Sequence, residues 1–150
     1  MAIDLKSSYF QKAHRLSLYN VAESVTDVHA GQLFQLDANG EWVYADGTKK
    51  AYPTLNNRFA GQGIGAQGER LEGRDDVSRT GKIAVLKGNF EIATDQFDDT
   101  KTYAPGAPLY AAAGGKLTPF DSAGGHKPEF IVGYVTVAPS PEHPMLRYEG

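Results

Sequence analysis

Short runs of alternating apolar and polar residues, broken by glycine and proline, make up most of the chain. Residues 82–94 alternate on both sides of Gly88, and a period of two predicts extended backbone with a bend or bulge at the glycine. The side chains expected to face inward are Ile83, Val85, Phe90 and Ile92. Residues 129–139 alternate in the same way but are apolar on both faces, so we predict a central strand there.

Two segments with the same layout predict β-hairpins. In residues 103–121, an extended run from Pro108 to Ala112 is followed by Gly114 and Gly115, which tolerate the positive φ angles of a tight turn, and then by a returning run. Residues 28–46 align with this segment without a gap, at a separation of 75 residues (106 − 31 = 75). The identical pairs are Gly31 and Gly106, Ala38 and Ala113, Gly40 and Gly115, and Asp46 and Asp121. Such an echo indicates either an internal repeat or two hairpins that meet the same physical demands.

The two ends of the chain differ from this pattern. In residues 1–27 neither a helical nor a strand period dominates, because Asn20 interrupts the helical stripe while residues 16–18 alternate as a strand would. We interpret residues 1–27 as an N-terminal arm whose aromatic side chains need a surface on the rest of the domain, a sister subunit or another protein. The alternative is a frayed tail. Residues 140–150 accompany three closely spaced prolines, which exclude a central strand, so we predict a C-terminal tail that runs over the surface.

Residues 47–81 are expected to form a long glycine-rich loop. Within it, residues 63–68 (GIGAQG) match the dinucleotide-binding pattern G-x-G-x-x-G. That pattern binds pyrophosphate only when a buried strand precedes it and a helix follows it. Neither flanking sequence fits, so a glycine-rich surface loop is the favoured interpretation, and a loop of this length in a compact domain is usually functional or disordered.

Composition supports a single all-β domain. The chain has 150 residues, of which 17 are glycine, and such a glycine content is typical of many turns and short strands. We expect a small β-barrel or β-sandwich-like domain over residues 28–139, built from short strands and hairpins, with the extended N-terminal arm attached. The net charge of −3 argues against nucleic acid or anionic lipid as the main partner. No segment has the length of a membrane span or a signal peptide, so we expect a soluble protein made in the cytosol that binds protein.

Reactive side chains follow no recognised catalytic or metal-binding pattern in the sequence. There is no cysteine, the four histidines are far apart, and no G-x-S-x-G motif occurs. Asp95, Asp98 and Asp99 lack the order of a calcium loop, and we expect a turn with exposed carboxylates instead. We therefore predict no catalytic residue, no cofactor and no metal, although dispersed carboxylates that act on glycosides are neither supported nor excluded.

Five segments carry a resemblance to a known family. They are Ala30-Gly31 before a predicted strand and residues 87–92 (KGNFEI), 103–110 (YAPGAPLY), 115–118 (GKLT) and 131–135 (IVGYV). In this order they resemble the small capsid decoration, or cement, proteins of tailed bacteriophages, in which a comparable order accompanies a compact β-barrel-like domain. The arm and the glycine-rich loop are larger than the simplest members of that family need.

The resemblance implies a non-enzymatic virion protein that is synthesised in the host cytoplasm and binds the outer surface of the assembled head. It would hold junctions between major capsid proteins as a homo-oligomer, with a trimer favoured over a dimer. An extended arm can add a strand to an exposed sheet edge, so the arm and the loop are the expected contacts with capsid or sister subunits. The expected contact residues are Ile3, Tyr9, Phe10, Leu16, Leu18 and Tyr19 in the arm, and Arg58, Phe59, Arg70 and Arg74 in the loop.

Two other functions remain open at this stage. A carbohydrate-binding β module on a virion surface would use a stacking platform made of Trp42, Tyr44, Tyr103 and Tyr110, although aromatic residues on short strands more often lie in a core or an interface. An enzyme acting through dispersed carboxylates would need a deep cleft with acids of perturbed pKa.

Overall fold

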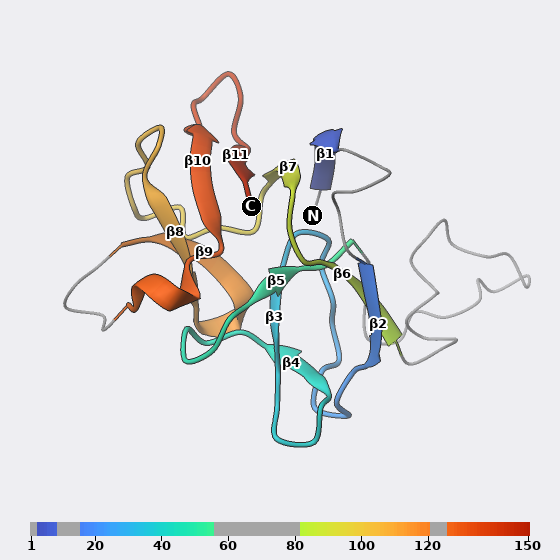
Figure 1. Cartoon of the computed structure of the whole chain (residues 1–150). Coiled ribbons are helices and arrows are strands. Elements are labelled where there is room, and N and C mark those ends of the chain that lie inside the picture. The colour runs from blue at the N-terminus through green and yellow to red at the C-terminus, as the bar shows by residue number, and fades with distance from the viewer. Residues whose placement is uncertain (1–2, 9–15, 56–81, 121–125) are drawn as a thin grey trace, which may run out of the picture.

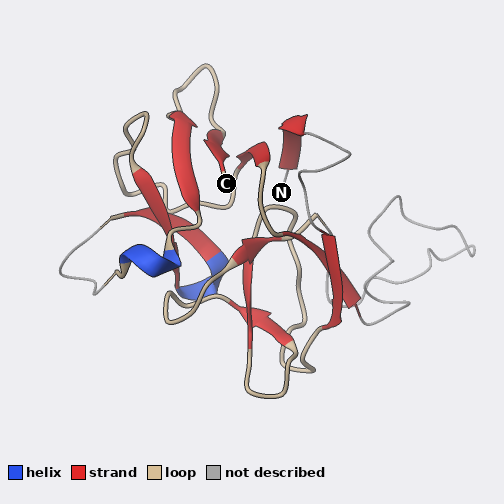
Figure 2. Ribbon diagram, in the orientation of Figure 1, coloured by secondary structure: helices blue, strands red, loops and turns tan. Residues whose placement is uncertain are grey.

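The computed structural model describes residues 3–8, 16–55, 82–120 and 126–150, and the regular structure of these residues is almost entirely strand (Figure 2). The strands are β1 (Ile3–Ser8), β2 (Leu16–Asn20), β3 (Leu33–Leu36), β4 (Trp42–Tyr44), β5 (Tyr52–Pro53), β6 (Lys82–Leu86), β7 (Phe90–Thr94), β8 (Pro108–Ala112), β9 (Lys116–Pro119), β10 (Gly133–Val137) and β11 (Leu146–Glu149). The two described helical segments, η1 (Ala113–Gly115) and η3 (Pro128–Phe130), have three residues each, and neither has the length or hydropathy of a membrane span. The predicted all-β class is confirmed.

Both predicted hairpins are present. β8 and β9 pair in antiparallel register, and the turn between them places Gly114 at φ 78° and Gly115 at φ 73°. β3 and β4 pair in the same way around Gly40, which has φ 77°. These angles lie in the left-handed region that glycine adopts without steric cost, which explains why the turns carry glycine at these positions.

Strands β2 to β6 form a first unit. β3 lies between β4 and β5, while β2 pairs with β6. The two groups are joined by a bridge between Thr54 and Val85 and by a hydrogen bond from the Leu55 amide to the Ala84 carbonyl oxygen at 3.1 Å. The strand order of the first unit is therefore β4-β3-β5-β6-β2.

Strands β7 to β11 form a second unit with the matching order. Its strands follow one another as β9-β8-β10-β11-β7, and β1 adds a sixth strand by pairing with β7. Figure 1 shows the second unit with β1 in the upper part of the view and the first unit below it. Since β1 precedes β2 in the chain but pairs with β7, the N-terminal segment links the two units.

The two units also share their pairing register, which distinguishes an internal repeat from two hairpins that are similar by chance. Phe34 pairs with Tyr44 in the first hairpin, and Leu109, which lies 75 residues after Phe34, pairs with Pro119. Strand β8 meets β10 at the positions equivalent to those where β3 meets β5. The echo is thus a structural repeat of a five-stranded unit rather than two unrelated hairpins.

Hydrogen bonds at the entry to each hairpin repeat as well. The Gly31 amide donates to the Thr54 carbonyl oxygen at 2.8 Å, and the Gly106 amide donates to the Val135 carbonyl oxygen at 2.7 Å. Both glycines have positive φ, 89° and 82°. The backbone needs a positive φ at the same position of both units, which explains why glycine occurs at this position in each.

Each unit curls until its first strand approaches its hairpin. A parallel bridge joins Val21 to Trp42 in the first unit and Phe97 to Leu117 in the second, again at equivalent hairpin positions. These are isolated bridges, so the described strands do not form a continuously hydrogen-bonded, closed barrel. The expectation of a barrel-like or sandwich-like domain holds only at the level of curled antiparallel sheets.

Two buried clusters fill the units. The first contains the apolar side chains that face inward in the first unit, namely Val25, Val28, Phe34, Trp42, Ile83 and Val85. The second contains the inward side chains of the second unit, and it also takes in Leu33, Ala45, Ala51 and Leu86 from the first unit. The outer face of the β3–β4 sheet is therefore covered by the second unit.

The predicted C-terminal tail is wrong. Residues 146–149 form β11, which lies between β7 and β10, and Leu146 and Tyr148 are fully buried. The reason is that all three prolines precede this strand, so its alternation of inward Leu146 and Tyr148 with outward Arg147 and Glu149 is free to pair.

Three other expectations need adjustment. The central strand predicted over residues 129–139 is central, but it spans only Gly133–Val137, because η3 begins at Pro128. The predicted loop 47–81 contains the short strand β5, and its residues 56–81, with the G-x-G-x-x-G match, lie outside the described residues. The backbone of the predicted arm pairs with the rest of the domain through β1 and β2, which is one of the three surfaces expected for it.

Candidate interaction surfaces

The outer face of the six-stranded sheet carries a row of side chains across four strands. Glu91 on β7 is opposite Glu149 on β11, which is opposite Tyr134 on β10, which is opposite Pro108 on β8. Residues directly opposite one another in antiparallel strands point to the same face. The row therefore passes from charged side chains at β7 and β11 to apolar ones at β10 and β8.

The apolar part of this face is exposed. Phe120, just after β9, is 50% exposed, and Tyr134 is 46% exposed. These are two of the three large apolar side chains that are exposed among the described residues, the third being Val137 at 45%. An exposed cluster of large apolar groups on a folded domain indicates an interaction surface.

Between these two residues, Tyr110 is covered by rings from its own chain. The His126 ring stacks on the Tyr110 ring with centroids 4.8 Å apart, and the Phe120 ring lies 5.7 Å from it. Burial, with a smaller contribution from Tyr134, raises the pKa of the Tyr110 phenol. The exposed aromatic rings on this face are therefore those of Phe120 and Tyr134.

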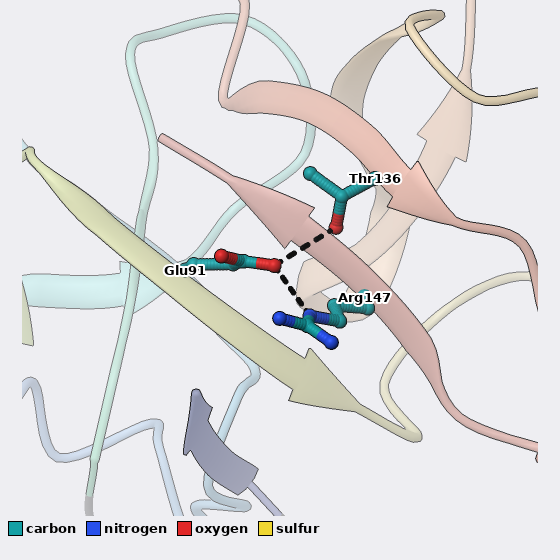
Figure 3. A network of polar contacts seen from close by, with 3 residues as sticks. All are labelled: Glu91, Thr136 and Arg147. Atoms are coloured by element: carbon teal, nitrogen blue, oxygen red, sulfur yellow. Dashed lines mark hydrogen bonds and ion pairs between the residues drawn. The ribbon is translucent and has the colours of Figure 1, made fainter. Parts of the chain in front are cut away.

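The charged part of the face is a small network across three neighbouring strands (Figure 3). The Nε of Arg147 donates to Oε1 of Glu91, and the Thr136 hydroxyl donates to the same oxygen at 3.4 Å. The side chains of Arg147 and Glu91 are 37% and 20% exposed. A pair with this much access to water contributes little to stability, so its main effect is to fix the charge pattern of the face.

A groove of about 730 Å³ lies where this face meets residues 128–133. Its walls include Lys50, Phe90, Glu91, Glu129, Tyr134 and Glu149. The Nζ of Lys50 donates to the Ile131 carbonyl oxygen, and burial lowers the pKa of this lysine. Glu91 is paired with Arg147, and the other two carboxylates, those of Glu129 and Glu149, against one lysine suit a polar or basic segment of a protein partner. The part of the chain that the structure describes contains no group of three or more His, Asp or Glu residues placed to hold a metal ion.

The aspartates suggested as a turn behave as expected. Oδ1 of Asp98 accepts hydrogen bonds from the amide and the hydroxyl of Thr100, at 3.0 and 2.6 Å. Both hydrogen bonds lower the pKa of the Asp98 carboxyl, and the bond from the Thr100 hydroxyl has the larger effect. The prediction of an Asp-stabilised turn is confirmed.

Three of the four residues of the alternative sugar-stacking platform are buried, and the fourth, Tyr44, is half-buried, as the favoured core position predicts. Trp42 is completely buried, and Tyr103 and Tyr110 are also buried. Trp42 belongs to the core of the first unit, where its ring packs edge-on against Tyr52 with centroids 6.1 Å apart. A buried indole presents no face to a sugar, because the alternation that makes β4 a strand turns Trp42 inward.

The predicted contact residues fall into two groups. Ile3 lies in β1, and Leu16, Leu18 and Tyr19 lie in β2, so the structure assigns their backbone but not their side chains. Tyr9, Phe10, Arg58, Phe59, Arg70 and Arg74 lie outside the described residues. The role of all ten in binding remains a prediction.

Sequence reasoning missed Phe120 and Tyr134 as exposed aromatic residues. For Phe120 the signal was available, because Leu117 and Pro119 alternate with Thr118 and Phe120 along β9 and its continuation. Inward placement of Leu117 therefore sends Phe120 outward. For Tyr134 no such signal exists, since β10 is apolar on both faces.

Comparison of the chain with protein-family models, with curated proteins and with solved structures finds no match.

Proposed function

We propose that this protein is a non-enzymatic decoration protein of a tailed-phage head, which binds the outer surface of the assembled capsid and stabilises junctions between major capsid proteins. The observation that supports the proposal most is where the five resembling segments lie. Four of the five contain turn or loop residues followed by the first residues of a strand, for example residues 87–92 at the turn into β7 and residues 103–110 leading into β8, and Ala30-Gly31 lies just before β3. The resemblance thus follows successive structural elements instead of being scattered.

A duplicated β unit suits such a role physically. Edge strands present unpaired N–H and C=O groups that can add to a strand of a partner, and β1 is an edge of the six-stranded sheet. The acidic groove adds a site for a basic segment. A protein that binds only the assembled lattice stabilises it by mass action, and many copies on one shell act together.

Binding to heads tests the proposal directly. The purified protein is mixed with emptied, expanded heads of the phage that encodes it, and bound protein is measured by co-sedimentation together with the melting temperature of the heads. We expect saturable binding and a raised melting temperature. Absence of binding at micromolar concentration, with the protein folded, would overturn the proposal.

Point substitutions are needed to test the arm and the loop as contacts. Deletion of residues 2–27 would also remove β1 from β7 and β2 from β6, so a loss of binding would not distinguish contact from folding. Tyr9→Ala, Phe10→Ala, Arg70→Ala and Arg74→Ala leave the described strands in place. Unchanged affinity in all four variants would show that the arm and the loop are not the main contacts.

A further inference from the structure

The contact between the two units has a specific geometry. The turn η1 of the second unit lies on the outer face of the β3–β4 sheet of the first unit. The Gly115 amide donates to the Ala45 carbonyl oxygen at 3.0 Å, and Nε2 of Gln32 donates to the Gly114 carbonyl oxygen at 2.9 Å. A hairpin turn of one unit thus docks on the outer sheet face of the other.

Repeat symmetry gives each partner in this contact an equivalent elsewhere in the molecule. The equivalent of the turn Ala113–Gly115 is the turn at residues 38–40, between β3 and β4. The equivalent of Ala45 is Phe120, on the outer face of the β8–β9 sheet. The first unit therefore has a turn equivalent to the one that docks, and the second unit has a sheet face equivalent to the one on which that turn docks.

Both equivalents are open to solvent, whereas Gly115 and Ala45 in the original contact are buried. Residues 38–40 are exposed, and a Cβ added to Gly40 would meet no atom within 4 Å. At Gly115 an added Cβ would overlap the Leu33 carbonyl oxygen. On the receiving side, Ala45 is fully buried, while Phe120 is 50% exposed. Both surfaces are exposed in the single chain, so both are available to contact another copy.

We propose that the free face around Phe120 and Tyr134 receives the turn at residues 38–40 of a second copy of this chain. The contact is head to tail, because one copy contributes its turn and the other its face. Contacts of this kind continue from copy to copy until a ring closes or a filament forms. Gly40 of one copy would lie against Phe120 of the next, as Gly115 lies against Ala45. This assembly is independent of capsid binding and is tested on the purified protein alone.

Sedimentation of the purified protein at several concentrations first measures how strongly the copies associate. We expect the protein to associate reversibly, and Phe120→Ser or Tyr134→Ser to weaken association at least about tenfold, as the loss of an aromatic anchor does. The matched control is Val137→Ser, which removes an equally exposed apolar side chain outside the proposed contact. Circular dichroism checks that each variant is folded. A protein that stays monomeric at all concentrations, or an oligomer that is insensitive to both substitutions at the face, would overturn the proposal.

Cross-linking then tests the pairing, and the absence of cysteine makes the result unambiguous. Asn39→Cys and Phe120→Cys are made as separate variants, mixed and oxidised. We expect a disulfide between the two different variants and little between identical ones. Cross-linking mainly between identical variants, or equally with Glu142→Cys as the exposed control, would overturn the head-to-tail contact. If the wild-type protein is monomeric and Phe120→Ser instead abolishes binding to heads, the face binds capsid and the proposal fails.

Discussion

The Gly115 amide donates a hydrogen bond to the Ala45 carbonyl oxygen at 3.0 Å and so joins the turn of the second hairpin to the sheet of the first. Gly115 has φ 73°, and a Cβ at this position would overlap the Leu33 carbonyl oxygen and lie 2.9 Å from Cγ of Gln32. The residue therefore meets two demands at once, a left-handed turn and a close approach between units. Only glycine satisfies both without displacement of the neighbouring backbone.

Gly115→Ala should lower the free energy of unfolding by about 3 kcal/mol or more. Left-handed backbone costs a residue with a Cβ about 1–2 kcal/mol, and the overlap with backbone of the first unit adds to this. Urea denaturation followed by circular dichroism measures the change.

Gly114→Ala is the matched control for this substitution. Gly114 has φ 78°, but an added Cβ would meet no atom within 4 Å, so only the cost of the left-handed backbone applies, about 1–2 kcal/mol. Equal losses in the two variants would contradict the close approach of the units at Gly115.

The alternation of apolar and polar residues and the positions of glycine predicted those parts of the fold that depend on neighbouring residues alone. The inward positions Ile83, Val85, Phe90 and Ile92 are all buried, and the hairpin glycines have positive φ. The three prolines exclude a strand only in the loop before Leu146, so the residues after them remain free to form the last strand. The repeat is visible in the sequence only as a weak similarity, because its units share their pairing register and the positive φ of Gly40 and Gly115 while most side chains differ. Pairing of β1 with β7 depends on long-range contacts that no local pattern records.

Tyr148→Phe should leave the free energy of unfolding unchanged or raise it by about 1 kcal/mol. The side chain is fully buried, and its hydroxyl has no hydrogen-bond partner among the described residues. A buried polar group without a partner carries a desolvation penalty of about 1–3 kcal/mol, which phenylalanine removes.

Tyr103→Phe provides the contrast. The Tyr103 hydroxyl donates to the Asp98 carbonyl oxygen at 2.8 Å, so its removal should cost about 0.5–1.5 kcal/mol. Urea denaturation of both variants at neutral pH measures the difference. A comparable loss in Tyr148→Phe would show that its hydroxyl is satisfied.

Stability should fall as the pH rises above about 10. Burial raises the pKa of Tyr148 above the ordinary value of 10.0, and burial followed by the charge of Asp98 raises that of Tyr103. Above the ordinary pKa the unfolded chain loses these protons while the folded protein keeps them. The free energy of unfolding then decreases by up to about 1.4 kcal/mol per pH unit for each tyrosine.

Denaturation from about pH 9 to about pH 11 measures this slope. Tyr148→Phe should make the slope shallower, because one of the tyrosines with a raised pKa no longer titrates. A slope that is the same in the wild-type protein and in the variant would mean that Tyr148 ionises equally in both states.

The interaction surface was harder to predict than the core, for a physical reason. Burial selects apolar residues with a regular period, so Ile83 and Val85 could be assigned from spacing alone. Exposure of Phe120 and Tyr134 depends on which elements cover the outer face, and the chain covers Tyr110 on that face with His126 while leaving its neighbours open. The groove likewise combines Lys50 from the first unit with carboxylates from the second, and only the tertiary structure brings these together.

Trp42→Ala distinguishes a core residue from a sugar-binding one. Because the indole is fully buried among the apolar side chains of the first unit, its truncation should lower the free energy of unfolding by about 3–5 kcal/mol. The matched variant Tyr134→Ala removes an aromatic ring that is 46% exposed and should change stability by no more than about 0.5 kcal/mol. Thermal unfolding and binding to a glycan array are measured on both. A Trp42→Ala protein that keeps its stability and loses binding to a glycan would contradict the buried position and restore the stacking platform. Loss of stability without any glycan signal in the wild-type protein is the result expected from the packing of the first unit.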